Sequence, residues 1–247
     1  MEGMLKLYSP INELKQIGEN IWIVDGNEIH MSFKLFKVPF TTRMTIVKID
    51  NNKLWIHSPI AFNKELNDKI KELGDIEHIV APNKYHYSYV LDWYNHYPNA
   101  KVWLAKGVST KLKIDERENF VSLDNISKTS WSEEIYFTPF KGSIAMEEMV
   151  FFHKKSSTLI LTDLIESIEV NKLPLLYKLV FKFGDNKYPK FRTSRDLRSS
   201  FIFKKQAKDS YSKIESWKPD KIVFSHGKII LENGTEKLKE AFYWLRK

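Results

Sequence analysis

The sequence predicts an α/β fold, and three observations support this class. Short runs of β-branched and aromatic residues alternate with segments whose apolar residues recur every three or four positions. A strand, a loop, a helix and a second strand follow one another between residues 77 and 104, which is the order of an α/β unit. No repeat, low-complexity tract or Gly/Ser linker divides the chain, so one domain is expected over residues 1–247.

The first expected elements are strands. Residues 21–24, 44–49 and 54–56 are short runs rich in β-branched and aromatic side chains, which favour strands. Asp-Asn-Asn at 50–52 separates the second run from the third, and these turn-forming residues predict a hairpin.

A helix and the α/β unit come next. Over residues 63–73 the apolar side chains recur at i, i+4 and i+7, and Asn63 is a favoured N-cap residue, so a helix is expected there. The unit that follows comprises a strand at 77–80, a helix at about 88–97 and a strand at 101–104. Ligands bind at the loops beyond strand ends in such units.

The second half of the chain predicts a hairpin, a strand and a closing helix. Residues 149–153 and 158–162 flank a short polar turn, and residues 221–224 form a further apolar run. The closing helix begins at about residue 235, where Leu238, Phe242 and Leu245 form its buried stripe.

Positive charge is concentrated in one stretch of the chain. The formal net charge is +8, and residues 172–213 contain twelve Lys or Arg against three Asp, a balance of +9. We interpret this stretch as a basic, largely helical segment that favours anionic partners. An anionic small molecule is the expected ligand. Nucleic acid is expected to bind only non-specifically, because no nucleic-acid motif is present.

Several classes of protein are excluded or disfavoured by the sequence. The absence of cysteine excludes a disulfide scaffold, a Cys-ligated metal and a thiol nucleophile. No G-x-S-x-G, G-x-x-x-x-G-K-[ST] or G-x-G-x-x-G motif occurs. No 18-residue apolar run predicts a transmembrane segment, and the first residues lack the apolar stretch of a signal peptide, so a cytoplasmic location is expected. The oligomeric state is not predicted.

Three polar side chains stand at or just beyond the ends of predicted strands. They are His86, Asp163 and His226, and imidazole and carboxylate groups on one rim of a sheet can bind a metal ion. Glu147 and Glu148, just before the strand at 149–153, could add another oxygen ligand, and Glu147 is the candidate fourth ligand or general base. The alternative is that each side chain caps a loop or bonds exposed backbone.

The order of these segments resembles the metallo-β-lactamase fold, and it is most similar to an uncharacterised branch of that superfamily, a domain family of unknown function. The resemblance runs from about residue 18 to 232 and implies a four-layer αβ/βα sandwich with a metal site on the sheet rim. The matching stretches are 21–26, 42–45, 54–59, 81–83 with His86, 146–148, 151–153, 162–164 and 225–227.

The resemblance also implies a degenerate metal motif. The superfamily's H-x-H-x-D-H loop corresponds to Pro-Asn-Lys-Tyr-His-Tyr at 82–87, which keeps only His86, and a histidine expected near Ile144 is missing. Asp163 matches the bridging carboxylate of the superfamily and His226 matches its last histidine. A two-metal centre needs about five or six protein ligands. One divalent ion, zinc or iron, and no metal at all are therefore equally expected.

Two functions stay open at this point. One is a metal-dependent hydrolase with a mononuclear site and an anionic small-molecule substrate; iron-dependent oxidation is a variant of it. The other is a non-catalytic descendant of the fold that binds an anionic ligand or partner through its basic segment. Arg43 either pairs a buried carboxylate, which we favour, or holds the anionic ligand. The further candidate substrate contacts are Lys187, Lys190, Arg192 and Arg195.

Overall fold

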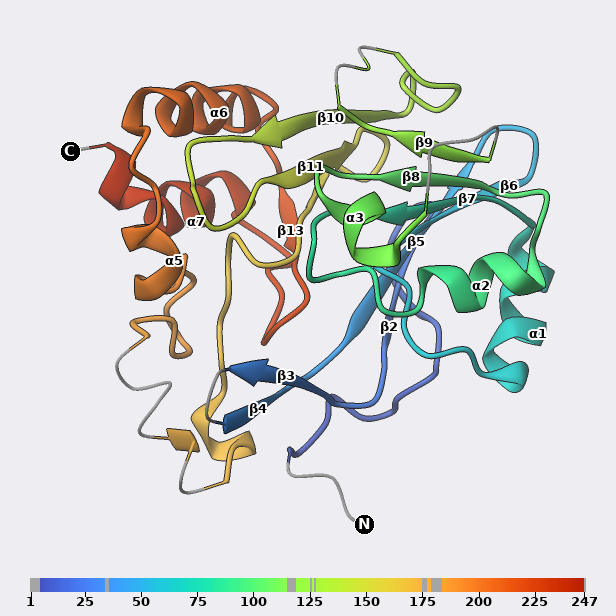
Figure 1. The fold of residues 1–247 in the computed structure, drawn as a ribbon, viewed down its shortest axis with the longest axis horizontal. Coiled ribbons are helices and arrows are strands. Elements are labelled where there is room, and N and C mark those ends of the chain that lie inside the picture. The colour runs from blue at the N-terminus through green and yellow to red at the C-terminus, as the bar shows by residue number, and fades with distance from the viewer. Residues whose placement is uncertain are drawn as a thin grey trace.

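The computed structural model describes residues 5–33, 36–114, 119–124, 126, 128–174, 177–178 and 184–246. Within these residues the strands form two main sheets and a separate hairpin (Figure 1). The larger sheet has the strand order β1 (Lys15–Gly18), β2 (Ile21–Asp25), β5 (Arg43–Ile49), β6 (Lys53–His57), β7 (Asp75–Ala81), β8 (Lys101–Leu104) and β9 (Phe120–Ser122). The smaller has the order β10 (Ile135–Phe140), β11 (Glu148–His153), β12 (Thr158–Ile160) and β13 (Lys221–Val223), and the hairpin pairs β3 (Ile29–Phe33) with β4 (Phe36–Phe40).

The helices lie on the outer faces of the two main sheets (Figure 1). α2 packs on β7 of the larger sheet, whereas α6 packs on β10 and α7 on β13 of the smaller sheet. This layered α/β arrangement confirms the predicted fold class. The helices are α1 (Lys64–Leu73), α2 (Val90–His96), α3 (Val108–Leu112), α5 (Arg195–Ser199), α6 (Lys204–Ser216) and α7 (Gly234–Ala241), with 3-10 turns η1 (Val170–Lys172) and η2 (Tyr243–Leu245).

Strand β11 shows how the layers pack. Side chains alternate between the two faces of a strand. Met149 and Phe151 therefore belong to the core between the sheets, where Phe151 meets the ring of Trp55 edge-on. Val150 and Phe152 belong to the second core, which the smaller sheet shares with α6 and α7. Both faces of this strand are buried, which explains its almost uninterrupted apolar sequence.

The local predictions hold at several element ends. β5 and β6 form the predicted antiparallel hairpin, and Asn51 and Asn52 in its turn both have φ of 61°, the left-handed conformation that asparagine tolerates. Asn63 caps α1, because its side-chain oxygen accepts a hydrogen bond of 2.8 Å from the Leu66 amide. The strands predicted at 158–162 and 221–224 end earlier, at Ile160 and Val223.

Those two strand ends create the rim that carries the candidate ligands. β12 and β13 are parallel neighbours, so the residues that follow them emerge at the same edge. The Ser225 amide donates to the Thr162 carbonyl at 3.3 Å, which keeps the two chains side by side beyond the strands. The loop after β7 joins this rim, because the Pro82 carbonyl accepts a hydrogen bond of 2.8 Å from the Met149 amide in β11.

The predicted basic segment at 172–213 has a mixed structure. Its residues 175–176 and 179–183 lie outside the described residues. Within the described part, the segment includes the helix α5 and most of the helix α6. Lys187 and Arg192 instead form isolated β-bridges with Ile168 and Glu166. Among the helices described here, none is long and apolar enough to span a membrane.

Candidate metal site

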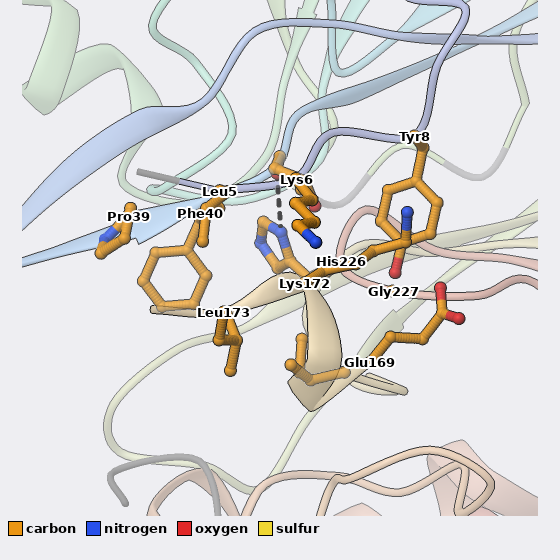
Figure 2. Close-up of a pocket in the computed structure, with 12 residues that line it drawn as sticks. Leu5, Lys6, Tyr8, Pro39, Phe40, Glu169, Lys172, Leu173, His226 and Gly227 are labelled. Atoms are coloured by element: carbon orange, nitrogen blue, oxygen red, sulfur yellow. Dashed lines mark hydrogen bonds between the residues drawn. The ribbon is translucent and has the colours of Figure 1, made fainter. Parts of the chain in front are cut away.

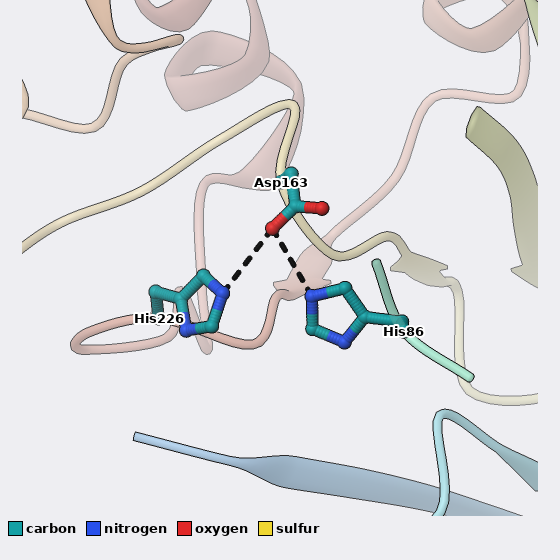
Figure 3. Close-up of side chains that lie close together, drawn as sticks. All are labelled: His86, Asp163 and His226. Atoms are coloured by element: carbon teal, nitrogen blue, oxygen red, sulfur yellow. Dashed lines mark hydrogen bonds and ion pairs between the residues drawn. The ribbon is translucent and has the colours of Figure 1, made fainter. Parts of the chain in front are cut away.

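The structure brings His86, Asp163 and His226 together (Figure 3). His86 lies in the loop after β7, Asp163 follows β12 and His226 follows β13. One potential ligand atom from each residue lies within 4.8 Å of the other two. The Nε2 atoms of His86 and His226 lie 3.1 Å and 3.2 Å from the same carboxylate oxygen, Asp163 Oδ1. The convergence expected from the strand ends is therefore found.

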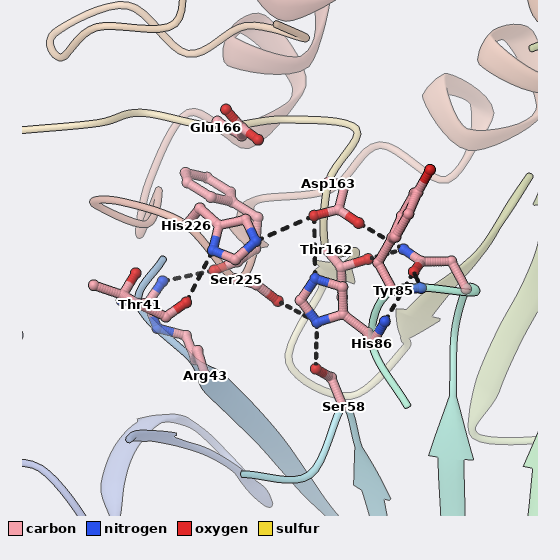
Figure 4. Close-up of polar contacts among 12 residues, drawn as sticks. Thr41, Arg43, Ser58, Tyr85, His86, Thr162, Asp163, Glu166, Ser225 and His226 are labelled. Atoms are coloured by element: carbon pink, nitrogen blue, oxygen red, sulfur yellow. Dashed lines mark hydrogen bonds and ion pairs between the residues drawn. The ribbon is translucent and has the colours of Figure 1, made fainter. Parts of the chain in front are cut away.

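The hydrogen bonds of His226 assign its tautomer. Its Nδ1 atom lies 2.9 Å from the Thr41 carbonyl oxygen, which can only accept, so Nδ1 carries the proton (Figure 4). In a neutral ring Nε2 then carries a lone pair, and this atom faces Asp163 Oδ1. Two acceptors in contact require either a second proton on the imidazole or a cation between them. A histidine whose other nitrogen donates to a carbonyl is the usual arrangement of a metal ligand.

His86 is oriented in a comparable way. Its Nδ1 atom lies 2.8 Å from the hydroxyl oxygen of Ser58 and 3.5 Å from that of Ser225. These contacts direct Nε2 toward Asp163. Two ligand atoms of a tetrahedral zinc ion with bonds of 2.0–2.1 Å are separated by about 3.3 Å. The two observed nitrogen–oxygen separations are close to this value, so each imidazole together with Asp163 Oδ1 has the spacing of two ligands of one such ion.

Asn83 holds the second oxygen of Asp163. Its Nδ2 atom donates to Asp163 Oδ2 at 2.8 Å, and its Oδ1 atom accepts from the backbone amides of Tyr85 and His86 at 2.8 Å and 3.0 Å. Asn83 is fully buried. One side chain thus orients the carboxylate and shapes the loop that carries His86.

Glu148 holds the backbone just after β12, where Asp163 lies. Its carboxylate accepts from the backbone amides of Thr162 at 2.6 Å and Asp163 at 2.9 Å. Burial and the neighbouring Asp163 charge raise the pKa of Glu148 to about 7. Burial also acts to raise the pKa of Asp163, but the charges and hydrogen bonds of His86 and His226 outweigh it and hold that pKa well below its usual range. Asp163 is therefore the anionic member of the cluster.

Arg43 holds the loop that carries His226. Its Nε and Nη2 atoms contact Asp25 Oδ1 at 2.8 Å and 2.7 Å. Its Nη1 atom donates to the carbonyls of Phe224 and Gly227 at 2.6 Å and 3.0 Å. The guanidinium is buried, so Arg43 is not positioned to contact a substrate. Its observed partners are those of the structural role.

A pocket of about 690 Å³ opens beside Asp163 and His226. Glu166, three residues after Asp163, contributes a further carboxylate that the sequence reasoning missed. The Asn186 amide group donates to it, and burial raises its pKa to about 7. The lining residues are Phe40, Tyr85, Ala145, Met146, Asp163, Glu166, Ser194, Asp196, Leu197 and His226.

A smaller cavity of about 340 Å³ also borders His226 (Figure 2). The N-terminal segment forms part of its wall, because the Lys6 amide donates to the Lys172 carbonyl at 3.0 Å. The Tyr8 ring lies under the Lys172 ammonium at 4.6 Å. The Phe40 ring, which lines both cavities, packs against the His226 imidazole with ring centroids 5.0 Å apart.

Glu147 does not join the three candidate ligands. It lines a separate groove with Lys106 and Lys141, and its neighbour Glu148 is the carboxylate that turns toward the rim. Glu147 precedes β11, whereas Glu148 is the first residue of that strand. The expected role of Glu147 as ligand or base is therefore not supported by its position.

The four basic candidates for substrate contact also lie away from the pocket lining. Lys190 and Arg192 form ion pairs with Asp185 at 3.0 Å and 2.9 Å. Lys187 and Arg195 are exposed. None of the four lines the 690 Å³ pocket. Local pairing and solvent exposure account for these side chains.

Comparison with known proteins agrees with this fold. A family described as "Domain of unknown function (DUF4336)" matches residues 19–201. No curated protein matches the chain. The chain is similar in structure to the metallo-β-lactamase DIM-1, with 11% identity, 97% of this chain and 100% of the other covered, and a TM-score of 0.61.

Two further structures agree with the same fold. A metallo-β-lactamase from Hirschia baltica has 13% identity, coverage of 94% and 97%, and a TM-score of 0.57. The metallo-β-lactamase FIM-1 from Pseudomonas aeruginosa, in its mono-zinc form, has 11% identity, coverage of 92% of each chain, and a TM-score of 0.58. At these identities the similarity establishes the metallo-β-lactamase fold alone.

Proposed function

We propose that this chain, which belongs to the DUF4336 family, is a metal-dependent hydrolase that holds one divalent ion on His86, Asp163 and His226. The observation that carries the proposal is the His226 ring, whose Nδ1 donates to the Thr41 carbonyl while Nε2 faces Asp163 Oδ1. Either a second proton on the imidazole or a cation satisfies this contact, and the convergence of His86 on the same carboxylate oxygen favours a cation. Zinc and iron both accept these ligand types.

A single ion is favoured by the surroundings of Asp163. Its Oδ1 atom faces both imidazoles, whereas its Oδ2 atom accepts the hydrogen bond from Asn83. Within the described part of the chain, this is the one group of three or more such ligands close enough to share an ion. The mono-zinc form of FIM-1 is a precedent for one metal on the fold.

The proposed chemistry divides between the ion and the pocket. A divalent ion lowers the pKa of a bound water and polarises a carbonyl or phosphoryl oxygen of the substrate. Glu166 lines the same pocket, and its pKa of about 7 suits a carboxyl group that takes up or releases a proton near neutral pH. We therefore assign Glu166 the acid–base role in place of Glu147, which lines a different groove.

An anionic small molecule stays the proposed substrate class. Its support is the positive charge of the ion, since the described residues that line the pocket include no Lys or Arg to supply that charge. Phe40, Tyr85 and Met146 supply apolar and aromatic walls for the remainder of the molecule.

Metal titration of the purified protein tests this function. After treatment with a chelator, zinc or iron should restore one ion per chain, measured by elemental analysis. Asp163→Asn and His226→Gln should abolish that uptake, whereas the control His96→Gln, at an exposed histidine on α2, should retain it. A wild-type protein that takes up neither metal would contradict the proposal.

A further inference from the structure

Three large apolar side chains form an exposed patch at the surface. Ile144, Ile202 and Phe203 are 66%, 56% and 53% exposed. Two backbone hydrogen bonds hold their loops together: the Ile144 amide donates to the Ser200 carbonyl at 3.0 Å, and the Phe203 amide donates to the Gly142 carbonyl at 3.1 Å. We call these three residues the apolar patch. Single exposed apolar residues are common, but contiguous ones mark interaction sites.

The backbone beneath the patch has little freedom to rearrange. Gly142 has a φ of +106°, and a Cβ atom there would lie 2.7 Å from the Phe203 carbonyl oxygen. The hydroxyl groups of Ser143 and Ser200 are hydrogen-bonded at 2.6 Å. The hydrogen bonds and the close contact at Gly142 therefore fix the two loops that carry the patch.

Lysines flank the apolar patch. Lys141 precedes Gly142, and Lys204 and Lys205 begin α6 directly after Phe203. All three are exposed, and the ion pairs of the described residues include none of them. The Lys204 ammonium lies 4.6 Å from the centre of the Trp244 ring, and Lys141 also lines the groove of Glu147. The first five residues of α6, 204–208, contain three Lys and no acidic residue. Exposed apolar side chains beside lysines match the chemistry of an anionic lipid surface.

The loop that carries Ile144 also supplies residues of the 690 Å³ pocket. Ala145 and Met146 belong to the same loop as Ile144 and line that pocket. Leu197 in α5 lines it too, three residues before Ser200. Figure 1 shows α5 and α6 at the same end of the molecule. A surface bound at the patch would therefore lie next to the pocket.

We propose that the apolar patch and its lysines dock this protein on an anionic lipid surface. Ile144, Ile202 and Phe203 enter the interface between head groups and acyl chains, and the lysines contact the phosphates. A second copy of the chain fits the surface less well, because a symmetric interface would bring the two sets of lysines together. The proposal goes beyond the hydrolase function and does not depend on the metal.

Vesicle sedimentation tests the proposal. The protein should sediment with vesicles of equimolar phosphatidylcholine and phosphatidylglycerol at low salt, and not with phosphatidylcholine alone. Lys204→Ala and Lys205→Ala should each weaken binding about fivefold. Ile202→Ser with Phe203→Ser should abolish it. The control Leu231→Ser, at a side chain 52% exposed outside the patch, should leave it unchanged.

A fluorescence measurement locates the contact. The chain contains no cysteine, so Phe203→Cys and the control Leu231→Cys each create a single labelling site for an environment-sensitive dye. On anionic vesicles the emission should shift to the blue at position 203 and stay constant at 231. Asp163→Asn should bind vesicles normally, which separates this inference from the metal site.

Three results would overturn docking on lipid. They are no sedimentation with anionic vesicles at low salt, equal dye responses at both positions, and a dimer in light scattering that Phe203→Ser dissociates. The last result would identify the patch as a protein–protein interface.

Discussion

The substitution Arg43→Lys should destabilise the protein without removing its ligand site. The guanidinium contacts Asp25 and two backbone carbonyls on either side of His226, those of Phe224 and Gly227. A lysine ammonium cannot contact the Asp25 carboxylate and the two carbonyl oxygens at the same time. At least one buried carbonyl then loses its donor, which costs about 1–3 kcal/mol, and the loss of the forked contact with Asp25 brings the total to about 2–4 kcal/mol. Asp25 keeps its ion pair with Lys15 at 2.8 Å, so no isolated buried charge remains.

Thermal unfolding followed by circular dichroism measures this effect. For a chain of this length, about 2–4 kcal/mol corresponds to a decrease in Tm of about 5–15 °C. The matched control is Arg195→Lys, at an exposed arginine of α5, and its Tm should stay within error of the wild type. An unchanged Tm for Arg43→Lys together with lost metal or substrate binding would refute the structural role and place Arg43 at the ligand.

Four further predictions concern the site and the buried histidines. Asp163→Asn should weaken metal affinity by more than about a hundredfold, measured by competition with a chelating dye, because it removes the anionic ligand. Asn83→Ala should weaken it about 10–100-fold in the same assay, since the carboxylate loses its orienting amide. Metal affinity should fall as the pH is lowered, because protons compete with the ion for the ligating groups, and the same dye assay measures it. Burial lowers the pKa of His78 and of His153 to about 4, so the unfolded chain binds protons that the native chain excludes. These two histidines therefore contribute a loss of stability of up to about 3 kcal/mol per pH unit below about pH 6.5, whereas the raised pKa values of Glu148 and Glu166 act in the opposite direction. Relative to the wild type, His78→Gln should reduce the loss of stability between pH 7 and pH 5, measured as urea midpoints, and an unchanged pH dependence would contradict this.

Much of the fold was predictable because it depends on local patterns. The turn at Asn51 and Asn52 and the cap at Asn63 follow from the conformations and hydrogen bonds that asparagine favours. The grouping of Asp163 and His226 was predictable for a related reason, since each follows an apolar strand and parallel neighbours end at the same edge.

The remaining site residues depend on contacts that sequence patterns do not encode. The choice between Glu147 and Glu148 requires the strand register to be known to one residue, because a shift of one residue exchanges the two faces. The charge of Lys190 and Arg192 gave no indication that Asp185 pairs with both. Asn83 carries no charge, and its importance becomes visible only through its partners in the folded chain.

The central claim is that His86, Asp163 and His226 bind one divalent ion, and a crystal structure of the zinc-treated protein with anomalous scattering tests it most directly. The account predicts one anomalous peak, bonded at about 2.0–2.2 Å to the Nε2 atoms of the two histidines and to Asp163 Oδ1. A map with no peak between these three atoms, from crystals in which zinc is bound elsewhere or not at all, would contradict it.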